Sequence, residues 1–130
     1  MAPRVRAVLD TSVVLASGIG PLEGELAISA ATLAELHFGV LVTDDVATRA
    51  ERLRRLSVLQ RRFDALPVDD AVVASYGRLA AAVVASGRSP RARVMDLLIA
   101  ATAHAHGARL YTRNADDLVG AAGLVEVVAV

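Results

Sequence analysis

The stretch that decides the fold is Val5-Arg6-Ala7-Val8-Leu9-Asp10-Thr11-Ser12, an apolar run that ends in a carboxylate and two hydroxyls. Such a run predicts a buried strand whose last side chain emerges at the carboxyl edge of a sheet. Open α/β sheets bind their ligands at that edge. Asp10 therefore stands where chemistry is expected, although an aspartate in this position is also a common helix N-cap, so that a purely structural role stays open.

The rest of the chain alternates between strand and helix patterns. After a short helical turn at 13–16, strands are expected at 26–28, within 63–68, at 108–112 and at 124–130. Helices are expected at 30–42, where nearly every face is apolar and the helix should be buried, and at 44–62, 69–86 and 92–106. This alternation, with short connections, predicts a three-layer α/β/α fold with a largely parallel central sheet, as one domain over residues 1–130.

The composition excludes several kinds of chemistry. The chain has no Cys, which rules out disulfides, zinc thiolates and thiol nucleophiles. All fourteen basic residues are Arg, which removes mechanisms that need a lysine amine, such as a P-loop or a Schiff base. The formal net charge is zero, so binding of nucleic acid would need local clusters of positively charged side chains. No apolar stretch is long enough to cross a bilayer, and we expect a soluble, cytoplasmic protein without a membrane partner.

Most acidic residues have an ordinary structural explanation. Polar or edge contexts account for Glu23, Glu25, Glu51, Asp64 and Glu126, and helix starts account for Asp44, Asp45, Asp69 and Asp70. The acids that remain are Asp10 and the pair Asp116-Asp117, which follow strands, and Glu35 and Asp96, which lie on apolar helices.

These remaining acids predict a metal site. The carboxyl ends of parallel strands share one edge of the sheet, where side chains from two helices can join them. Oxygen ligands without His or Cys suit Mg²⁺ or Mn²⁺, and such a site binds phosphate oxygens and activates water. Structural alternatives stay open. Glu35 could lie on a solvent-exposed face of its helix, and Asp96 could form an ordinary i,i+3 ion pair with Arg93. His37 lies on a different face of its helix from Glu35 and reads as a surface or core-edge residue.

Arginines recur along the expected helix at 44–62, at positions 49, 52, 54, 55, 61 and 62. Such a run usually forms a solvated face, and the functional alternative is a patch that contacts phosphates. Arg113 follows the same strand as the Asp116-Asp117 pair, which makes it the leading candidate to guide a phosphate backbone into the site.

Four segments carry a family resemblance: Asp10-Thr11-Ser12, Thr32 to Gly39, Asp96 to Ala103 and Thr112 to Leu118. In order and spacing they resemble the four acidic motifs of PIN domains, and the short chain and the second motif are most similar to VapC-type toxins. The resemblance implies a PIN-like fold and a metal-dependent ribonuclease that leaves 5′-phosphate and 3′-hydroxyl ends. It also implies a homodimer and a VapB-type antitoxin whose tail occupies the active-site groove. Leu118 departs from the family, which usually has Phe there.

The resemblance also selects the site residues. The family pattern Thr-x-Asn-x-x-Asp aligns onto Thr112, Asn114 and Asp117, with Asn114 as the expected helix cap. This alignment favours Asp117 over Asp116, which would then be a surface acid. The hypothesis is a catalytic set of Asp10, Glu35, Asp96 and Asp117, in which Asp10 and Asp96 are the direct ligands of Mg²⁺ or Mn²⁺.

The predicted function is accordingly that of a Mg²⁺-dependent endoribonuclease, the toxin of a VapBC-type toxin–antitoxin system, with RNA as substrate. Two alternatives remain. One is a catalytically silent PIN-like scaffold, which would be expected to have lost some of the four acids. The other is a haloacid-dehalogenase-like phosphatase, which resembles the chain only in its first motif and needs a lysine that the chain lacks.

Overall fold

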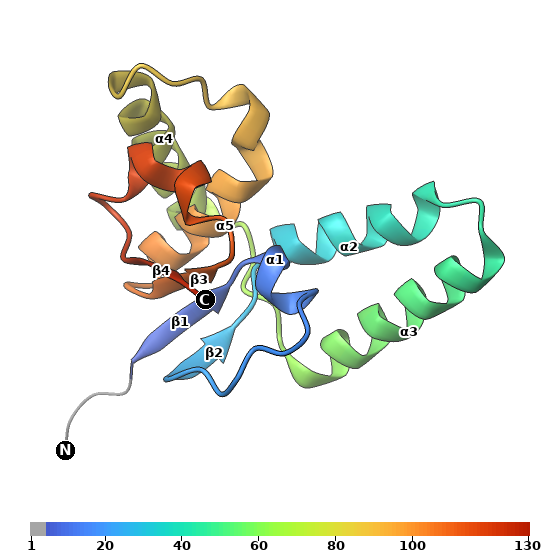
Figure 1. Ribbon diagram of the computed structural model, residues 1–130. Coiled ribbons are helices and arrows are strands. Elements are labelled where there is room, and N and C mark those ends of the chain that lie inside the picture. Colours follow the sequence, from blue (N-terminus) through green and yellow to red (C-terminus); the bar gives the residue numbers. More distant parts are fainter. Residues whose placement is uncertain (1–4) are drawn as a thin grey trace.

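The computed structural model describes residues 5–130 and contains a four-stranded parallel sheet in the order β2-β1-β3-β4. The strands are β1 (Arg6–Leu9), β2 (Glu25–Ala27), β3 (Arg109–Thr112) and β4 (Val127–Ala129). Strand β1 lies between β2 and β3, with Val8 opposite Ala27 and Leu9 opposite Tyr111 (Figure 1). The largely parallel sheet is confirmed, and the opening stretch of the sequence is one of its two central strands.

Helices connect the strands. They are α1 (Thr11–Val14), α2 (Ala30–Val42), α3 (Val46–Arg62), α4 (Asp70–Ala85) and α5 (Val94–Ala105), with 3₁₀ helices η1 (Arg91–Arg93) and η2 (Ala115–Ala121). Side-chain caps fix their starts: Ser29 accepts from the Ala31 N–H, Asp45 from Thr48 and Asp69 from Val72. These side-chain caps explain why α2, α3 and α4 begin close to their predicted first residues.

Two apolar clusters, one on each face of the sheet, give the three layers. Val8 and Leu110 point into the larger cluster, which contains residues of α4, α5 and η2. Ala7, Leu9 and Tyr111 point the other way, into a cluster that includes α1 and the beginning of α2. Because neighbouring residues of a strand face opposite sides, the single apolar run of β1 serves both clusters.

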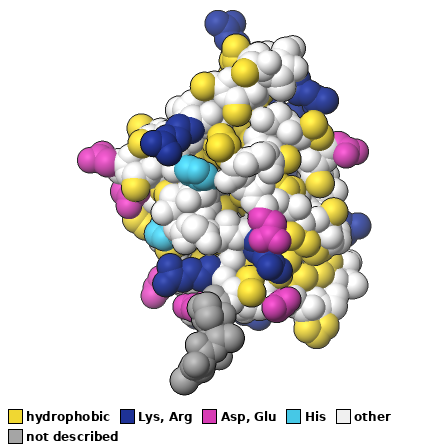
Figure 2. Space-filling model, turned by 90° about the vertical axis from the view of Figure 1, so that its left-hand side faces the viewer, with side chains coloured by type: hydrophobic (Ala, Val, Ile, Leu, Met, Phe, Trp, Pro, Cys, Tyr) yellow, Lys and Arg dark blue, Asp and Glu magenta, His cyan; other side chains and the backbone are white. Residues whose placement is uncertain are grey.

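The prediction that α2 is buried is wrong. Only Ala31, Thr32 and Val40 of this helix are buried, whereas Phe38 is 67% exposed and Leu41 is 73% exposed. The reason is that α2 and α3 form a pair that extends away from the sheet, so that no layer covers the outer half of α2 (Figure 1). Apolar side chains also appear among the charged ones on the face seen in Figure 2, and exposed valines occur on α4 and η2 as well.

Two strand predictions also need correction. Between residues 63 and 68 there is no strand: Leu66 alone pairs, in an isolated bridge with Ser29, and Pro67 has no N–H with which to extend the pairing. The last strand is shorter than predicted and forms the edge of the sheet next to β3, where Ala129 is exposed. No helix within residues 5–130 is long and apolar enough to span a membrane.

Candidate functional site

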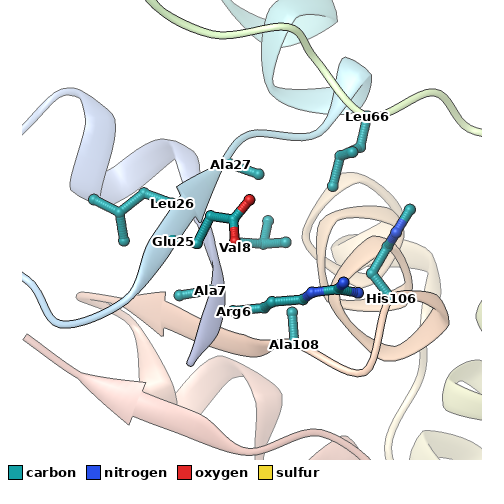
Figure 3. A pocket seen from close by; sticks show the side chains of 9 residues that line it. All are labelled: Arg6, Ala7, Val8, Glu25, Leu26, Ala27, Leu66, His106 and Ala108. Carbon is teal, nitrogen blue, oxygen red and sulfur yellow. The ribbon is translucent and has the colours of Figure 1, made fainter. Parts of the chain in front are cut away.

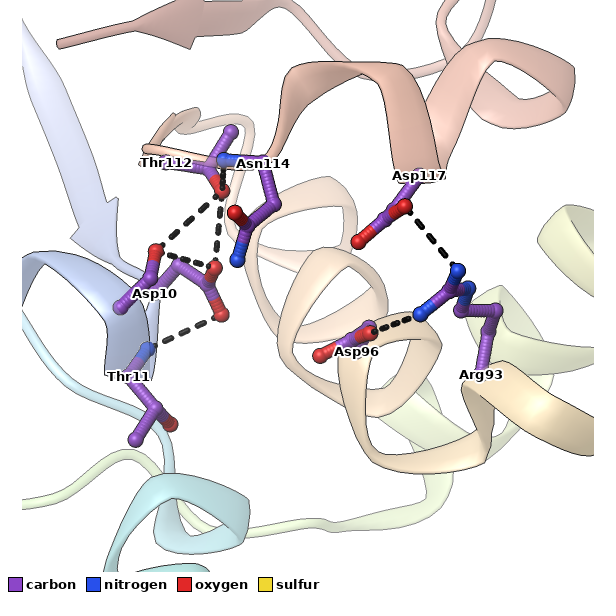
Figure 4. Close-up of polar contacts among 8 residues, drawn as sticks. Asp10, Thr11, Arg93, Asp96, Thr112, Asn114 and Asp117 are labelled. Atoms are coloured by element: carbon purple, nitrogen blue, oxygen red, sulfur yellow. Dashed lines mark hydrogen bonds and ion pairs between the residues drawn. The ribbon is translucent and has the colours of Figure 1, made fainter.

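Asp10 lies at the carboxyl end of β1, is buried, and accepts hydrogen bonds at both carboxylate oxygens. Oδ1 accepts from the Thr11 N–H at 2.9 Å, while Oδ2 accepts from the Ser12 and Thr112 hydroxyls, each at 2.8 Å. Thr112 is the last residue of β3, so that one hydrogen bond joins the ends of the two central strands (Figure 4). Asp10 therefore does cap α1, and the same carboxylate stands at the expected edge of the sheet.

Glu35 is half-buried on α2 and connects to the first motif through a hydroxyl. The Thr11 hydroxyl donates to Glu35 Oε1 at 2.7 Å and lies 3.1 Å from the Thr32 hydroxyl. Glu35 therefore faces the carboxyl end of β1 and is tied to the loop that carries Asp10. His37 is exposed, as expected for a surface residue.

Asp96 lies in the first turn of α5 and has a perturbed pKa. Burial raises the pKa of Asp96 above its usual value, and the nearby charges of Asp10, Glu35 and Asp117 raise it further, against the opposing effect of Arg93. Three acids from three other elements thus act on one carboxylate. The fold brings the four predicted acids into one region of negative potential.

Asp117 lies in η2 and forms an ion pair with Arg93. The Arg93 guanidinium lies 3.0 Å from Asp117 Oδ1 and 3.9 Å from Asp96 Oδ2, as Figure 4 shows. Asp116 is exposed, so the adjacent acids point differently. Asn114 occupies the cap position of η2, but its side chain makes no cap hydrogen bond. The predicted cap position is therefore confirmed, whereas the contact found there is the Asn114 N–H donating to the Thr112 hydroxyl at 3.0 Å.

The donor chemistry of this region fits a hard divalent cation. All four acids offer oxygen, and a cation among them would relieve the charge repulsion that Asp96 experiences. In residues 5–130, no three Asp, Glu or His side chains yet converge closely enough to hold an ion. Hydrogen bonds from hydroxyls hold Asp10 and Glu35, and Arg93 holds Asp117. A bound ion would have to draw its ligands together against these contacts.

Arginines line the cavities next to the acids. A cavity of about 370 Å³ beside Glu35 is lined by Thr11 and by Arg52 and Arg55 of α3. Another, of about 330 Å³, is lined by Arg113, Asn114, Asp116 and Asp117. Part of the arginine run and the predicted Arg113 therefore flank the acidic region from two sides.

A separate cavity of about 180 Å³ opens at the amino ends of the strands. Its lining includes Arg6, Glu25 and His106, which Figure 3 shows around the first residues of β1 and β2. None of the predicted site residues lines it, since they lie at the opposite ends of the strands.

Two functional features were missed at the sequence level. The hydroxyls of Ser12 and Thr112 both bind Asp10, and Arg93 reaches beyond its helical neighbour Asp96 to Asp117. The repeated Thr and Ser residues next to the acids could have signalled the first feature. The second depends on how η2 packs near α5, which spacing along the chain does not show.

The fold and the site together define the class of this protein. It is a parallel α/β domain with four acids near the carboxyl ends of its central strands, and such a site is chemically suited to divalent cations and phosphate esters. A family model of the PIN domain matches residues 7–123. The chain belongs to the PIN domain family, which confirms the resemblance drawn from the four motifs.

Individual relatives agree with this membership. The chain is 41% identical over 99 residues to Ribonuclease VapC8 of Mycobacterium tuberculosis, covering 73% of this chain and 88% of that protein. It is 37% identical over 131 residues to Ribonuclease VapC5 of the same organism, covering 95% and 94%. A crystal structure of VapBC-5 from M. tuberculosis, a member of the VapBC family of toxin–antitoxin systems, matches with a TM-score of 0.83 at 35% identity, covering 97% of this chain and 98% of that one.

Proposed function

We propose that this protein is a Mg²⁺- or Mn²⁺-dependent endoribonuclease and the toxin of a VapBC-type toxin–antitoxin system. The observation that carries the proposal is the placement of the four acids. Hydroxyls of Thr11 and Thr112 donate to Glu35 and Asp10 at the carboxyl ends of the central strands, and the Arg93 guanidinium contacts both Asp96 and Asp117. Burial and the charges of the other three acids raise the pKa of Asp96, and a divalent cation bound among these oxygens would offset that repulsion. The names of the two relatives, both ribonucleases of the VapC type, support the same activity.

Asp10 and Asp96 are the residues we assign as metal ligands. When bound, the metal would supply an activated water and neutralise charge on the phosphate that is attacked. The Thr11, Ser12 and Thr112 donors fix the Asp10 carboxylate, so that its oxygens are oriented before a ligand arrives. Glu35, held by the Thr11 hydroxyl, lies on the other side of the first motif, where it can accept a proton from water.

RNA is the proposed substrate, and the flanking arginines are the proposed contacts to its phosphates. The chain has no net charge, so attraction to RNA must come from local groups such as Arg52, Arg55 and Arg113, which line cavities beside Glu35 and Asp117. Arg113→Ala is expected to weaken RNA binding and to flatten its dependence on salt. An unchanged affinity and salt slope would argue against the contact.

A VapB-type antitoxin and a second copy of the chain are the proposed protein partners. The related VapBC-5 structure belongs to a toxin–antitoxin family, and the exposed apolar side chains of α2 and α3 offer surface for a partner to cover. Since the RNA substrate must share a compartment with the enzyme, we place the protein in the cytoplasm.

The activity is tested by incubating the purified protein with structured RNA in Mg²⁺, in Mn²⁺ and in EDTA, followed by mapping of the cut ends. We expect cleavage only with metal, leaving 5′-phosphate and 3′-hydroxyl ends. Cleavage that persists in EDTA, or that leaves cyclic phosphates, would refute metal-activated water. An RNA left intact in every condition, by a folded protein, would instead favour the silent scaffold.

A further inference from the structure

Arg93 holds two of the four acids at once. It is the last residue of η1, directly before α5, and its guanidinium lies between Asp117 of η2 and Asp96 of α5, at 3.0 and 3.9 Å. Figure 4 shows its two terminal nitrogens directed at these two carboxylates. The arginine side chain is 44% exposed and each aspartate side chain is 33% exposed, so that solvent and a ligand can both reach the group.

Arg93 is also the one cation paired with the acidic site within residues 5–130. Other arginines form their ion pairs elsewhere, with Glu51, Glu23 and Glu126. A guanidinium stays charged at every accessible pH and matches carboxylate and phosphate oxygens with its planar fork. Of the arginines around the acids, only Arg93 is thus in direct ion-pair contact with them in the described residues, and it lies on the Asp117 side of the region.

The contacts divide the acids into two groups. On one side, hydroxyl and amide donors hold Asp10, and Thr11 holds Glu35. On the other side, Arg93 pairs closely with Asp117. Asp96 lies between them, with its Arg93 contact long at 3.9 Å. Asp96 thus has only a distant cationic partner and experiences the charge of Asp10, whereas Asp117 has a close cationic partner.

Enzymes that hydrolyse phosphodiesters often place two metal ions about 3.5–4 Å apart, one for the attacking and one for the leaving oxygen. We propose that in this protein Arg93 takes the place of the second ion. The site then binds one divalent ion, on the side of Asp10 and Asp96. Arg93 is a positioning residue that keeps Asp117 away from the metal and presents a fixed positive charge beside it. This inference rests on the proposed function, since it concerns the same site.

The test counts bound ions without any substrate. Mn²⁺ is titrated into the folded protein and the free ion is measured by electron paramagnetic resonance, for the wild type, Arg93→Gln and Arg93→Lys. We expect one bound Mn²⁺ in the wild type, two in Arg93→Gln, where Asp117 becomes free to bind, and one again in Arg93→Lys, which keeps the charge. The matched control is Arg91→Gln, an exposed arginine two residues away whose side chain forms no ion pair with any residue in 5–130; it should bind one.

Two bound ions in the wild type would overturn the proposal, and so would a single ion in Arg93→Gln. If Arg93→Gln fails to fold, the wild-type count decides alone: one ion supports the proposal and two overturn it. The outcome is separable from that of the proposed function, because RNA cleavage is not measured. Absence of metal-dependent cleavage by the wild type would refute the ribonuclease, whatever the number of Mn²⁺ ions bound.

Discussion

Replacing Thr112 with Val should destabilise the fold through the loss of one hydroxyl. This fully buried hydroxyl donates to Asp10 Oδ2 at 2.8 Å and accepts from the Asn114 N–H at 3.0 Å. A hydrogen bond to a charged group contributes about 1.5–3 kcal/mol, and one between neutral groups about 0.5–1.5 kcal/mol. Asp10 keeps two other donors and the Asn114 N–H can reach water, so the lower ends of these ranges apply and the sum is about 2 kcal/mol.

In a domain of 130 residues, 1 kcal/mol moves the melting temperature by about 3–4 °C. Thr112→Val should therefore melt about 6–8 °C below the wild type when unfolding is followed by circular dichroism in EDTA. The control is Thr112→Ser, which keeps the hydroxyl and loses a methyl group worth about 1 kcal/mol, or about 3–4 °C. If the valine variant melts at or above the serine variant, the hydroxyl does not support Asp10 as the structure indicates.

Three further predictions follow from other residues of the fold and site. Because the pKa of Asp96 is raised, the folded state binds the Asp96 proton more tightly than the unfolded state does. Ionisation of Asp96 therefore lowers the free energy of unfolding as the pH rises above 3.8, the ordinary pKa of an aspartate. Asp96→Asn should therefore melt above the wild type at pH 7 in EDTA, with a difference that shrinks as the pH falls toward 4; a constant difference would contradict this. Asp69→Ala removes the cap that accepts from the Val72 N–H and should cost about 1 kcal/mol in urea unfolding; no change would mean that α4 does not need its cap. In RNA cleavage, Asp117→Asn should lower the rate by more than ~10-fold, while Asp116→Asn stays within a few-fold of the wild type; the reverse order would make Asp116 the fourth acid.

Features that depend on local chemistry could be predicted from the sequence. Ser29 and Asp69 are side-chain caps with polar atoms in the right place, and they fixed the starts of α2 and α4 within a residue. The Asp10 carboxylate was expected at the carboxyl edge of the sheet because the apolar run of β1 predicts a buried strand that ends at this polar residue. Local explanations for the other nine acids left five candidates for the site, and the family pattern then favoured Asp117 over Asp116.

Features that depend on packing between distant segments could not be predicted in this way. An apolar helix indicates burial, but the sequence does not say which layer covers it, and the outer part of α2 lies uncovered in the single chain. Spacing along the chain offered Arg93 one partner, Asp96, as an i,i+3 alternative to the metal-ligand role of that acid. Its closer partner is Asp117, more than twenty residues further along the chain, since the packing of η2 near the start of α5 decides that contact.

The four-acid metal site is tested most sharply by the single-turnover rate of RNA cleavage in saturating Mg²⁺ by Asp96→Asn compared with the wild type. If Asp96 is a metal ligand, the variant should lose more than ~100-fold in rate, since even residues outside a metal's ligand shell contribute ~10–100-fold. Because the same variant is expected to be more stable than the wild type in EDTA, unfolding would not explain such a loss. Cleavage by Asp96→Asn at the wild-type rate would contradict the claim that these four acids form one metal-dependent site.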